Sequence, residues 1–113
     1  GKELDEDVFL MKQEGNKIFI CVLNVREGKI LGKTSTNIDI ENKIFLNLEE
    51  EIVSAFYLKH PIPKSIIFQE SFEKKFENLE NNLQLQKGGK IEFHYPKIKS
   101  RRKELLDGRI KFS

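Results

Sequence analysis

The feature that most constrains this fold is a pair of strand-like segments joined by a short polar turn. Residues 18–23 form an unbroken apolar run, and residues 29–36 form a second segment rich in β-branched side chains. Between them lies Arg26-Glu27-Gly28-Lys29, whose glycine can adopt a positive φ. Two strands separated by such a turn pair antiparallel. The sequence therefore predicts a β-hairpin, with Gly32 marking a bulge or a close approach in its second strand.

The size and composition indicate one soluble domain. The chain has 113 residues, of which 34% are charged, and nine phenylalanines supply a core. No stretch approaches the roughly 20 apolar residues that span a membrane, and the acidic start lacks the apolar stretch of a signal peptide. We therefore expect a cytoplasmic protein. Cys21 is predicted to be a small buried hydrophobe, and together with His60 and His94 it is too little for a structural zinc site. We expect no cofactor and no small-molecule ligand.

Periodicity and end signals predict five strands and three helices. In the second predicted helix, Ser71 is the expected N-cap, and Phe72, Phe76, Leu79 and Leu83 repeat at helical spacing, so Phe76 and Leu79 are expected to be buried. The Gly88-Gly89 pair is expected to end that helix. Residues 37–46 fit either an edge strand or a packed loop. The strands are expected at 8–13, 18–25, 29–36, 65–68 and 91–95, and the helices near 47–59, 71–86 and 100–107.

The first predicted helix has its own signals. Asn47 is a good N-cap, and residues 49–51 are acidic, which suits the positive end of the helix dipole. Its apolar face is predicted to comprise Leu48, Ile52, Ala55 and Phe56.

The order of elements predicts a fold class. The order β-β-β-α-β-α-β-α is that of an RNase H-like α/β (α+β) domain. Right-handed crossovers would make strand one central and parallel to strands four and five. The expected architecture is a five-stranded mixed sheet with helices on both faces, in which strand 18–25 is buried on both sides.

The hairpin and the segments after it resemble a central region of the UvrC family. That family has an Asp-Val strand, an apolar strand, a turn with arginine and glycine, and a strand containing glycine. Here Asp7-Val8, residues 18–25, Arg26 to Lys29 and residues 30–32 match in that order. Further along, Phe56-Tyr57, Ile62-Pro63, the apolar residues 66–68, and Pro96, Lys97, Arg101, Arg102 and Leu105 also match. Ile98 and Lys99 depart from the family pattern, which has a glycine and an acidic residue there.

The resemblance implies both a position and a function. The nuclease, cysteine-rich, UvrB-binding and helix-hairpin-helix signatures of the family are not in this sequence, so residues 1–113 are expected to be a single excised domain. It would lie between the UvrB-binding segment and the C-terminal RNase H-like nuclease. The resemblance implies nucleotide excision repair by the UvrABC excinuclease, the SOS response, and UvrB and damaged double-stranded DNA as partners.

The sequence argues against a complete nuclease site. An RNase H-like site needs several carboxylates or histidines around two metal ions, including an aspartate in the first strand. Met11 and Lys12 occupy the expected position, and Asp7 is expected at the entry of the strand, at the wrong end. Glu70 follows the fourth strand, where a second carboxylate would lie, and Glu49 to Glu51 open the first predicted helix, so these are the remaining candidate ligands. We therefore interpret the domain as a degenerate RNase H-like domain without catalytic or metal-binding residues.

The basic segment near residue 100 is the candidate DNA-binding site. The net charge is only +2, but it is unevenly distributed, with acidic residues near the start. The cluster could contact phosphates, or it could be a solubilising helix start. Three hypotheses stay open: a non-catalytic module of a DNA-incision protein, an active RNase H-like nuclease that uses Glu70 and acidic neighbours, and a purely structural interaction domain. The candidate residues are Lys97, Lys99, Arg101, Arg102 and Lys103.

Overall fold

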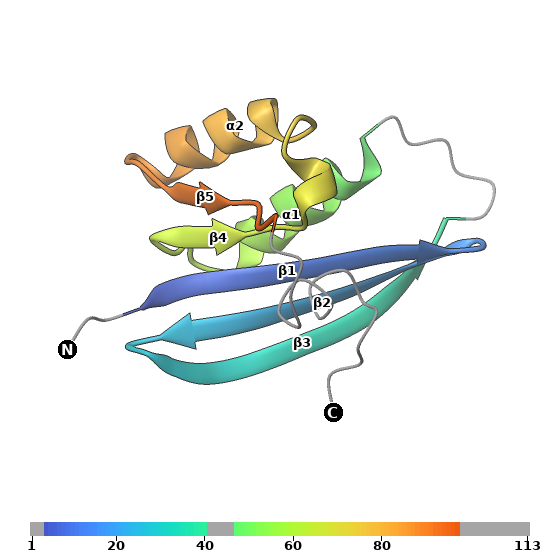
Figure 1. Ribbon diagram of the computed structural model, residues 1–113, viewed down its shortest axis with the longest axis horizontal. Helices are drawn as coiled ribbons and strands as arrows, with labels where there is room; N and C mark the ends of the chain where they lie inside the picture. Colours follow the sequence, from blue (N-terminus) through green and yellow to red (C-terminus); the bar gives the residue numbers. More distant parts are fainter. Residues whose placement is uncertain (1–3, 41–46, 98–113) are drawn as a thin grey trace.

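A computed structural model describes residues 4–40 and 47–97 of the chain (Figure 1). Five strands, two α-helices and one short 3-10 helix lie in these ranges. They are β1 (Asp5–Glu14), β2 (Lys17–Arg26), β3 (Lys29–Asp39), α1 (Leu48–Lys59), β4 (Ser65–Ile67), η1 (Glu70–Phe72), α2 (Glu77–Lys87) and β5 (Glu92–His94).

The strands form one mixed sheet in the order β3-β2-β1-β4-β5. The three long strands pair antiparallel in sequence order, whereas β4 pairs parallel with β1 and β5 pairs parallel with β4. This arrangement confirms that the first strand is central and parallel to the fourth. The fold is the predicted RNase H-like α+β class.

The β2–β3 connection is the predicted tight turn. Glu27 and Gly28 have φ values of 53° and 74°, as a two-residue hairpin turn with two left-handed positions requires. The register then shifts, because Val25 faces Ile30 whereas Asn24 faces Gly32. The shift leaves one extra residue in β3 and confirms the bulge expected beside Gly32.

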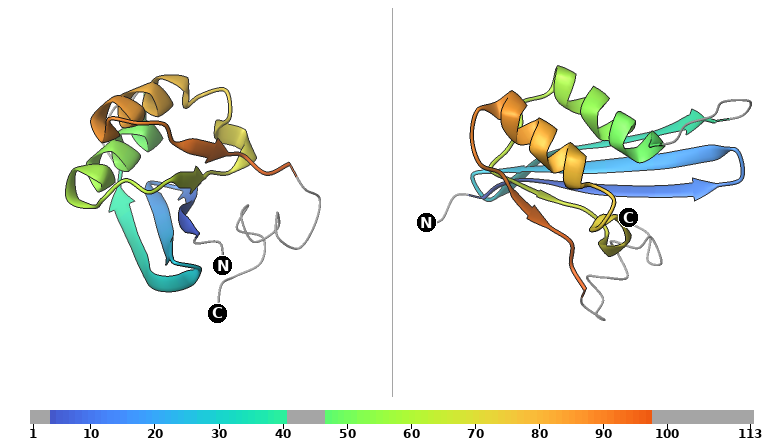
Figure 2. Two further views of the ribbon diagram at one scale, coloured as in Figure 1. Left: turned by 90° about the vertical axis from the view of Figure 1, so that its left-hand side faces the viewer. Right: turned by 90° about the horizontal axis from the view of Figure 1, so that it is seen from above.

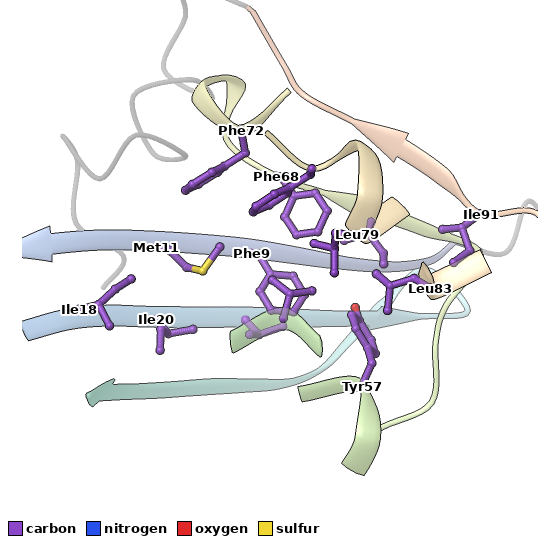
Figure 3. Close-up of a cluster of buried hydrophobic side chains, with 14 residues drawn as sticks. Phe9, Met11, Ile18, Ile20, Tyr57, Phe68, Phe72, Leu79, Leu83 and Ile91 are labelled. Atoms are coloured by element: carbon purple, nitrogen blue, oxygen red, sulfur yellow. The ribbon is translucent and has the colours of Figure 1, made fainter. Parts of the chain in front are cut away.

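Both described helices cover the same face of the sheet (Figure 2). Val53 and Tyr57 of α1 and Leu79 and Leu83 of α2 belong to one buried cluster, which also contains Phe9 of β1 (Figure 3). The sequence predicted helices on both faces of the sheet, but α1 and α2 both lie on one face. The third predicted helix, near 100–107, lies outside the described residues. None of the described helices has the length and apolar character needed to cross a membrane.

The opposite face of the sheet carries a smaller apolar cluster, which corrects one expectation. Leu10 and Ile67 are buried there, with Cys21 half-buried beside them. On β2, Phe19 of this face is 41% exposed. The prediction that strand 18–25 is buried on both sides was wrong, since β1 and not β2 is the central strand and the described helices lie on the other face.

The first helix is rotated relative to its predicted orientation. Asn47 occupies the N-cap position but makes no side-chain capping hydrogen bond. The most buried residues are Val53 and Tyr57, while Ala55 is exposed. Apolar periodicity alone did not predict this orientation of α1, because Tyr57 is buried through a hydrogen bond to Asp7, described below.

The second helix begins six residues later than its predicted N-cap. The segment around Ser71 is the 3-10 helix η1, and Phe76 is the N-cap of α2. The rings of Phe72 and Phe76 stack with centroids 4.7 Å apart and planes 4° from parallel, so the apolar spacing is preserved across a turn. All four predicted apolar residues are buried. Gly88 ends the helix with φ 76°, as expected, and its N–H bonds the carbonyls of Gln84 and Leu85.

Candidate functional site: a buried aspartate held by Arg26 and Tyr57

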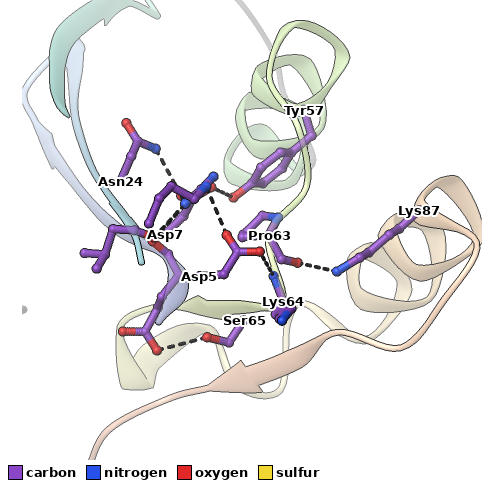
Figure 4. Close-up of polar contacts among 11 residues, drawn as sticks. Asp5, Asp7, Asn24, Tyr57, Pro63, Lys64, Ser65 and Lys87 are labelled. Atoms are coloured by element: carbon purple, nitrogen blue, oxygen red, sulfur yellow. Dashed lines mark hydrogen bonds and ion pairs between the residues drawn. The ribbon is translucent and has the colours of Figure 1, made fainter. Parts of the chain in front are cut away.

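The most unusual polar group of the fold is Asp7, whose side chain is completely buried. Its Oδ1 accepts hydrogen bonds from Arg26 Nη1 at 2.8 Å and from Asn24 Nδ2 at 3.0 Å. Its Oδ2 accepts a hydrogen bond from the Tyr57 hydroxyl at 2.5 Å (Figure 4). Both carboxylate oxygens are therefore engaged by side-chain donors. A buried carboxylate requires such compensation, because losing its hydration is costly.

The β1–β2 pairing brings these groups together. In the antiparallel register, Asp5 faces Arg26 and Asp7 faces Asn24. Residues two apart on a strand share a face, so both aspartates and both partners lie on the side covered by α1. The side chain of Tyr57 extends from α1 toward Asp7 and contacts its carboxylate (Figure 4). The cluster therefore ties two strands and a helix at one point.

Arg26 compensates more than one charge. Its Nε lies 2.9 Å from Asp5 Oδ1, and its Nη1 lies 2.8 Å from Asp7 Oδ1. The same Nη1 donates to the backbone carbonyls of Glu6 and Val25. A planar guanidinium with several fixed donors suits this bridging position, which a lysine would not fill equally well.

The protonation states follow from these contacts. Burial raises the pKa of Tyr57 far above its ordinary value, and the negative charge and hydrogen bond of Asp7 raise it further. Burial alone would lower the pKa of Arg26, but its hydrogen bond to Asp7 and the charges of Asp7 and Asp5 outweigh that effect and raise it. Tyr57 therefore remains a neutral donor and Arg26 a cation across the neutral range.

This arrangement has a clear chemical consequence. A carboxylate binds a catalytic metal ion through lone pairs that face the ion, usually together with other acidic ligands. In this structure the guanidinium of Arg26 lies against Asp7 Oδ1, where a metal ion would otherwise bind, and the Tyr57 hydroxyl donates a hydrogen bond to Oδ2. Within residues 4–40 and 47–97, no group of three or more histidine, cysteine or acidic side chains is placed to hold a metal ion.

The structure corrects the predicted position of Asp7. We expected it at the strand entry, but β1 begins at Asp5, so Asp7 lies within the strand and faces Ile66 of β4 on its parallel side. Glu70 opens η1 after β4, near the predicted place, and residues 49–51 lie in the first turn of α1. These carboxylates do not converge with Asp7 on a common point.

The other predicted site residues are only partly described. Lys97 forms an exposed ion pair with Glu73 at 2.9 Å, and the hydrogen bond to Glu73 raises the pKa of Lys97. His94 lies on the same sheet face as Glu92, with Nε2 3.8 Å from its carboxylate. The remaining residues of the basic segment, Lys99, Arg101, Arg102 and Lys103, lie outside the described residues.

Sequence reasoning missed the polar cluster, although a signal for it was present. Asp5 and Asp7 repeat at a spacing of two, and so do Asn24 and Arg26 at the far end of the hairpin. Extending the first strand to Asp5 would have paired the two sets directly. The apolar run that predicts the first strand begins only at Val8, and the acidic residues before it have a composition that normally indicates solvent exposure.

The fold and the closed aspartate cluster define an RNase H-like α+β domain whose first strand carries an internally neutralised carboxylate. The model of the UvrC ribonuclease H-like domain family matches residues 5–108, so the chain belongs to that family.

Two curated relatives carry the same region. UvrABC system protein C of Fusobacterium nucleatum subsp. nucleatum is 52% identical over 94% of this chain, which covers 18% of that protein. UvrABC system protein C of Desulforudis audaxviator is 27% identical over 94% of this chain and 17% of its own length. The chain therefore spans less than a fifth of each relative.

The Tyr57 contact predicts an unequal response of two tyrosines to the same substitution. Tyr57→Phe leaves an oxygen of the buried Asp7 without its donor, so we expect a loss of about 1–3 kcal/mol in the free energy of unfolding. Tyr95 also donates to a carboxylate, at 2.6 Å from Glu80 Oε2, but both residues are only partly buried. Water can replace that donor, so Tyr95→Phe is the matched control, with an expected loss below about 1 kcal/mol. Urea unfolding measures both, and equal losses would contradict the role assigned to Asp7.

Proposed function

We propose that this domain is a non-catalytic central module of the UvrC subunit of the UvrABC excinuclease, which makes the dual incisions of nucleotide excision repair. It would lie between the UvrB-binding segment and the C-terminal RNase H-like nuclease and act in the cytoplasm. The family match and the relative that is 52% identical support the UvrC context. The small share of each relative that the chain covers is consistent with a module of a larger protein.

The observation that carries the non-catalytic role is the closed environment of Asp7. An RNase H-like two-metal site needs an aspartate in the first strand. Met11 and Lys12 take the position expected for it, so Asp7 is the buried candidate that remains in β1. Here that carboxylate is fully buried and bridged to Arg26, so it stabilises the junction of β1, β2 and α1. Such a use of the residue favours a rigid spacer that positions neighbouring domains.

We further propose that the basic segment contacts the phosphate backbone of damaged double-stranded DNA, or supports the contact with UvrB, in the full-length protein. Its residues are Lys97, Lys99, Arg101, Arg102 and Lys103. For Lys97, a phosphate would have to compete with Glu73, whose carboxylate already pairs with the Lys97 ammonium. An exposed ion pair of this kind is weak and can be exchanged for a phosphate.

The non-catalytic role predicts that incision does not require Glu70. In the full-length protein, we expect Glu70→Ala to leave both the 3′ and the 5′ incision of a damaged duplex unchanged. Glu77→Ala is the matched control, since Glu77 lies on the exposed side of α2. Incision is followed on a duplex labelled at both ends in the presence of UvrA, UvrB and magnesium. Loss of metal-dependent cleavage in Glu70→Ala alone would instead favour an active nuclease site in this domain.

The DNA-contact proposal predicts a change in salt dependence. Replacing Arg101, Arg102 and Lys103 together with alanine removes three phosphate partners, so we expect the slope of log K against log salt to fall by roughly 3 in the full-length protein. The loss should be equal for unrelated DNA sequences, because phosphate contacts carry no sequence information. Lys74 and Lys75, which are exposed and lie between η1 and α2, provide a control double substitution to alanine. An unchanged slope together with unchanged incision would mean that the segment is a solubilising helix start.

A further inference from the structure

In the described part of the chain, β3 presents a long and regular edge that no other strand covers. It is one of the two edge strands of the sheet, and among the described residues it pairs with β2 alone. Nine of its eleven residues are exposed. The bulge lies near its start, between Ile30 and Gly32, and the pairing with β2 is uninterrupted from Gly32 to Asp39. Residues 33–39 therefore form a regular edge that could accept another strand. Figure 1 shows β3 at the border of the sheet.

The hydrogen bonds between β2 and β3 determine which backbone groups of β3 point toward the outer edge. The Ile40 N–H bonds the carbonyl of Asn16 at 2.8 Å, so these opposed residues form a bonded pair. Opposed residues in an antiparallel ladder alternate between bonded and non-bonded pairs, so the neighbouring pair of Asp39 and Lys17 is non-bonded. Counting back in steps of two, the backbone groups of residues 33, 35, 37 and 39 point toward the outer edge.

The sequence along this edge is complementary to itself. Residues 33–39 read Lys-Thr-Ser-Thr-Asn-Ile-Asp, with a cation at one end, an anion at the other and Thr36 at the centre. We propose that β3 pairs antiparallel with β3 of a second copy of this chain, about a two-fold axis at Thr36. In this register Lys33 lies opposite Asp39 of the second copy, and by symmetry Asp39 lies opposite its Lys33. The two sheets then become one continuous sheet.

The side chains on each face of the paired edge support this register. On the helix-covered face, Thr34 lies opposite Ile38 and Thr36 opposite its own copy, so every cross-strand contact joins β-branched side chains. On the other face, Ser35 lies opposite Asn37 between the two Lys33–Asp39 pairs. The bonded positions of the new ladder are residues 33, 35, 37 and 39, which are the residues whose backbone groups face outward.

Other pairings of the same edge lose this complementarity. A parallel pairing in register would place Lys33 beside its own copy, and like charges opposite each other are destabilising. Centring the antiparallel pairing on Ser35 or on Asn37 leaves Lys33 and Asp39 without each other. Centring it on Thr34 places Lys29 opposite Asp39, but the bulge near Ile30 interrupts the ladder there.

The charges also explain why the partner would be a second copy. A lysine in an edge strand discourages pairing with an arbitrary strand. In the self-paired register, Lys33 meets a carboxylate. That carboxylate already lies 3.4 Å from Lys17 of its own sheet and is 69% exposed, so it can accept a second ammonium. The other edge strand, β5, has only three residues, which makes it a poorer template.

The experiment is a set of charge reversals followed by sedimentation equilibrium of the whole 113-residue chain. We expect the unmodified chain to shift from monomer to dimer with rising concentration. Lys33→Asp and Asp39→Lys should each weaken dimerisation by about tenfold or more, because each places like charges opposite each other twice. An equimolar mixture of the two variants should associate again, since every opposed pair is then of opposite charge. The double variant Lys33→Asp/Asp39→Lys should also dimerise.

Lys29→Asp is the matched control, because Lys29 is an exposed lysine of the same strand on the other side of the bulge. It should leave the association constant unchanged. A chain that stays monomeric up to its solubility limit overturns the proposal, and so does a dimer that neither single reversal weakens. A mixture of the two reversals that remains monomeric also overturns it. Thermal melting checks that each variant is folded. We expect all of them to fold, because the substituted positions are exposed.

Discussion

The buried ion pair between Asp7 and Arg26 is the contact on which this structure most depends. A carboxylate with no exposed surface is stable only if its lost hydration is replaced, and Arg26, Asn24 and Tyr57 together do so. Removing one partner of such a pair costs about 3–5 kcal/mol, because the remaining charge stays buried and uncompensated. The donors come from β2 and α1, so the pair fixes how the helix sits on the sheet.

The same contact is the basis of the proposed function. An aspartate in the central strand is available to a metal ion only if its lone pairs face an open site with further acidic ligands. In this chain they face a guanidinium and a phenol hydroxyl, and the apolar cluster around Phe9 and Phe68 packs against the same face of the sheet. These contacts use the carboxylate of Asp7 to join β1, β2 and α1. This arrangement supports the proposed role of a rigid spacer.

Much of the fold could be predicted from the sequence, because local signals and tertiary packing agree there. The Glu27-Gly28 turn, the bulge beside Gly32 and the glycine that ends α2 all follow from backbone preferences. The start of α2, the orientation of α1 and the depth of Asp7 could not be predicted. The start of α2 depends on a local contact that periodicity does not reveal, the stacking of Phe72 on Phe76 across a turn. The other two depend on a contact distant in sequence, the hydrogen bond from Tyr57 to Asp7. The basic segment after Lys97 remains a prediction.

A manganese titration of the isotopically labelled domain, followed by NMR, tests the structural role of Asp7 most directly. Bound manganese broadens the signals of nuclei close to it, so the side-chain carboxyl signals report which acidic residues meet the ion. The account predicts that the signals of Asp7 and Tyr57 stay sharp, while those of exposed acidic side chains such as Glu92 broaden weakly and without saturation. Saturable broadening that begins at Asp7 would show that its carboxylate is a metal ligand, and would contradict the central claim.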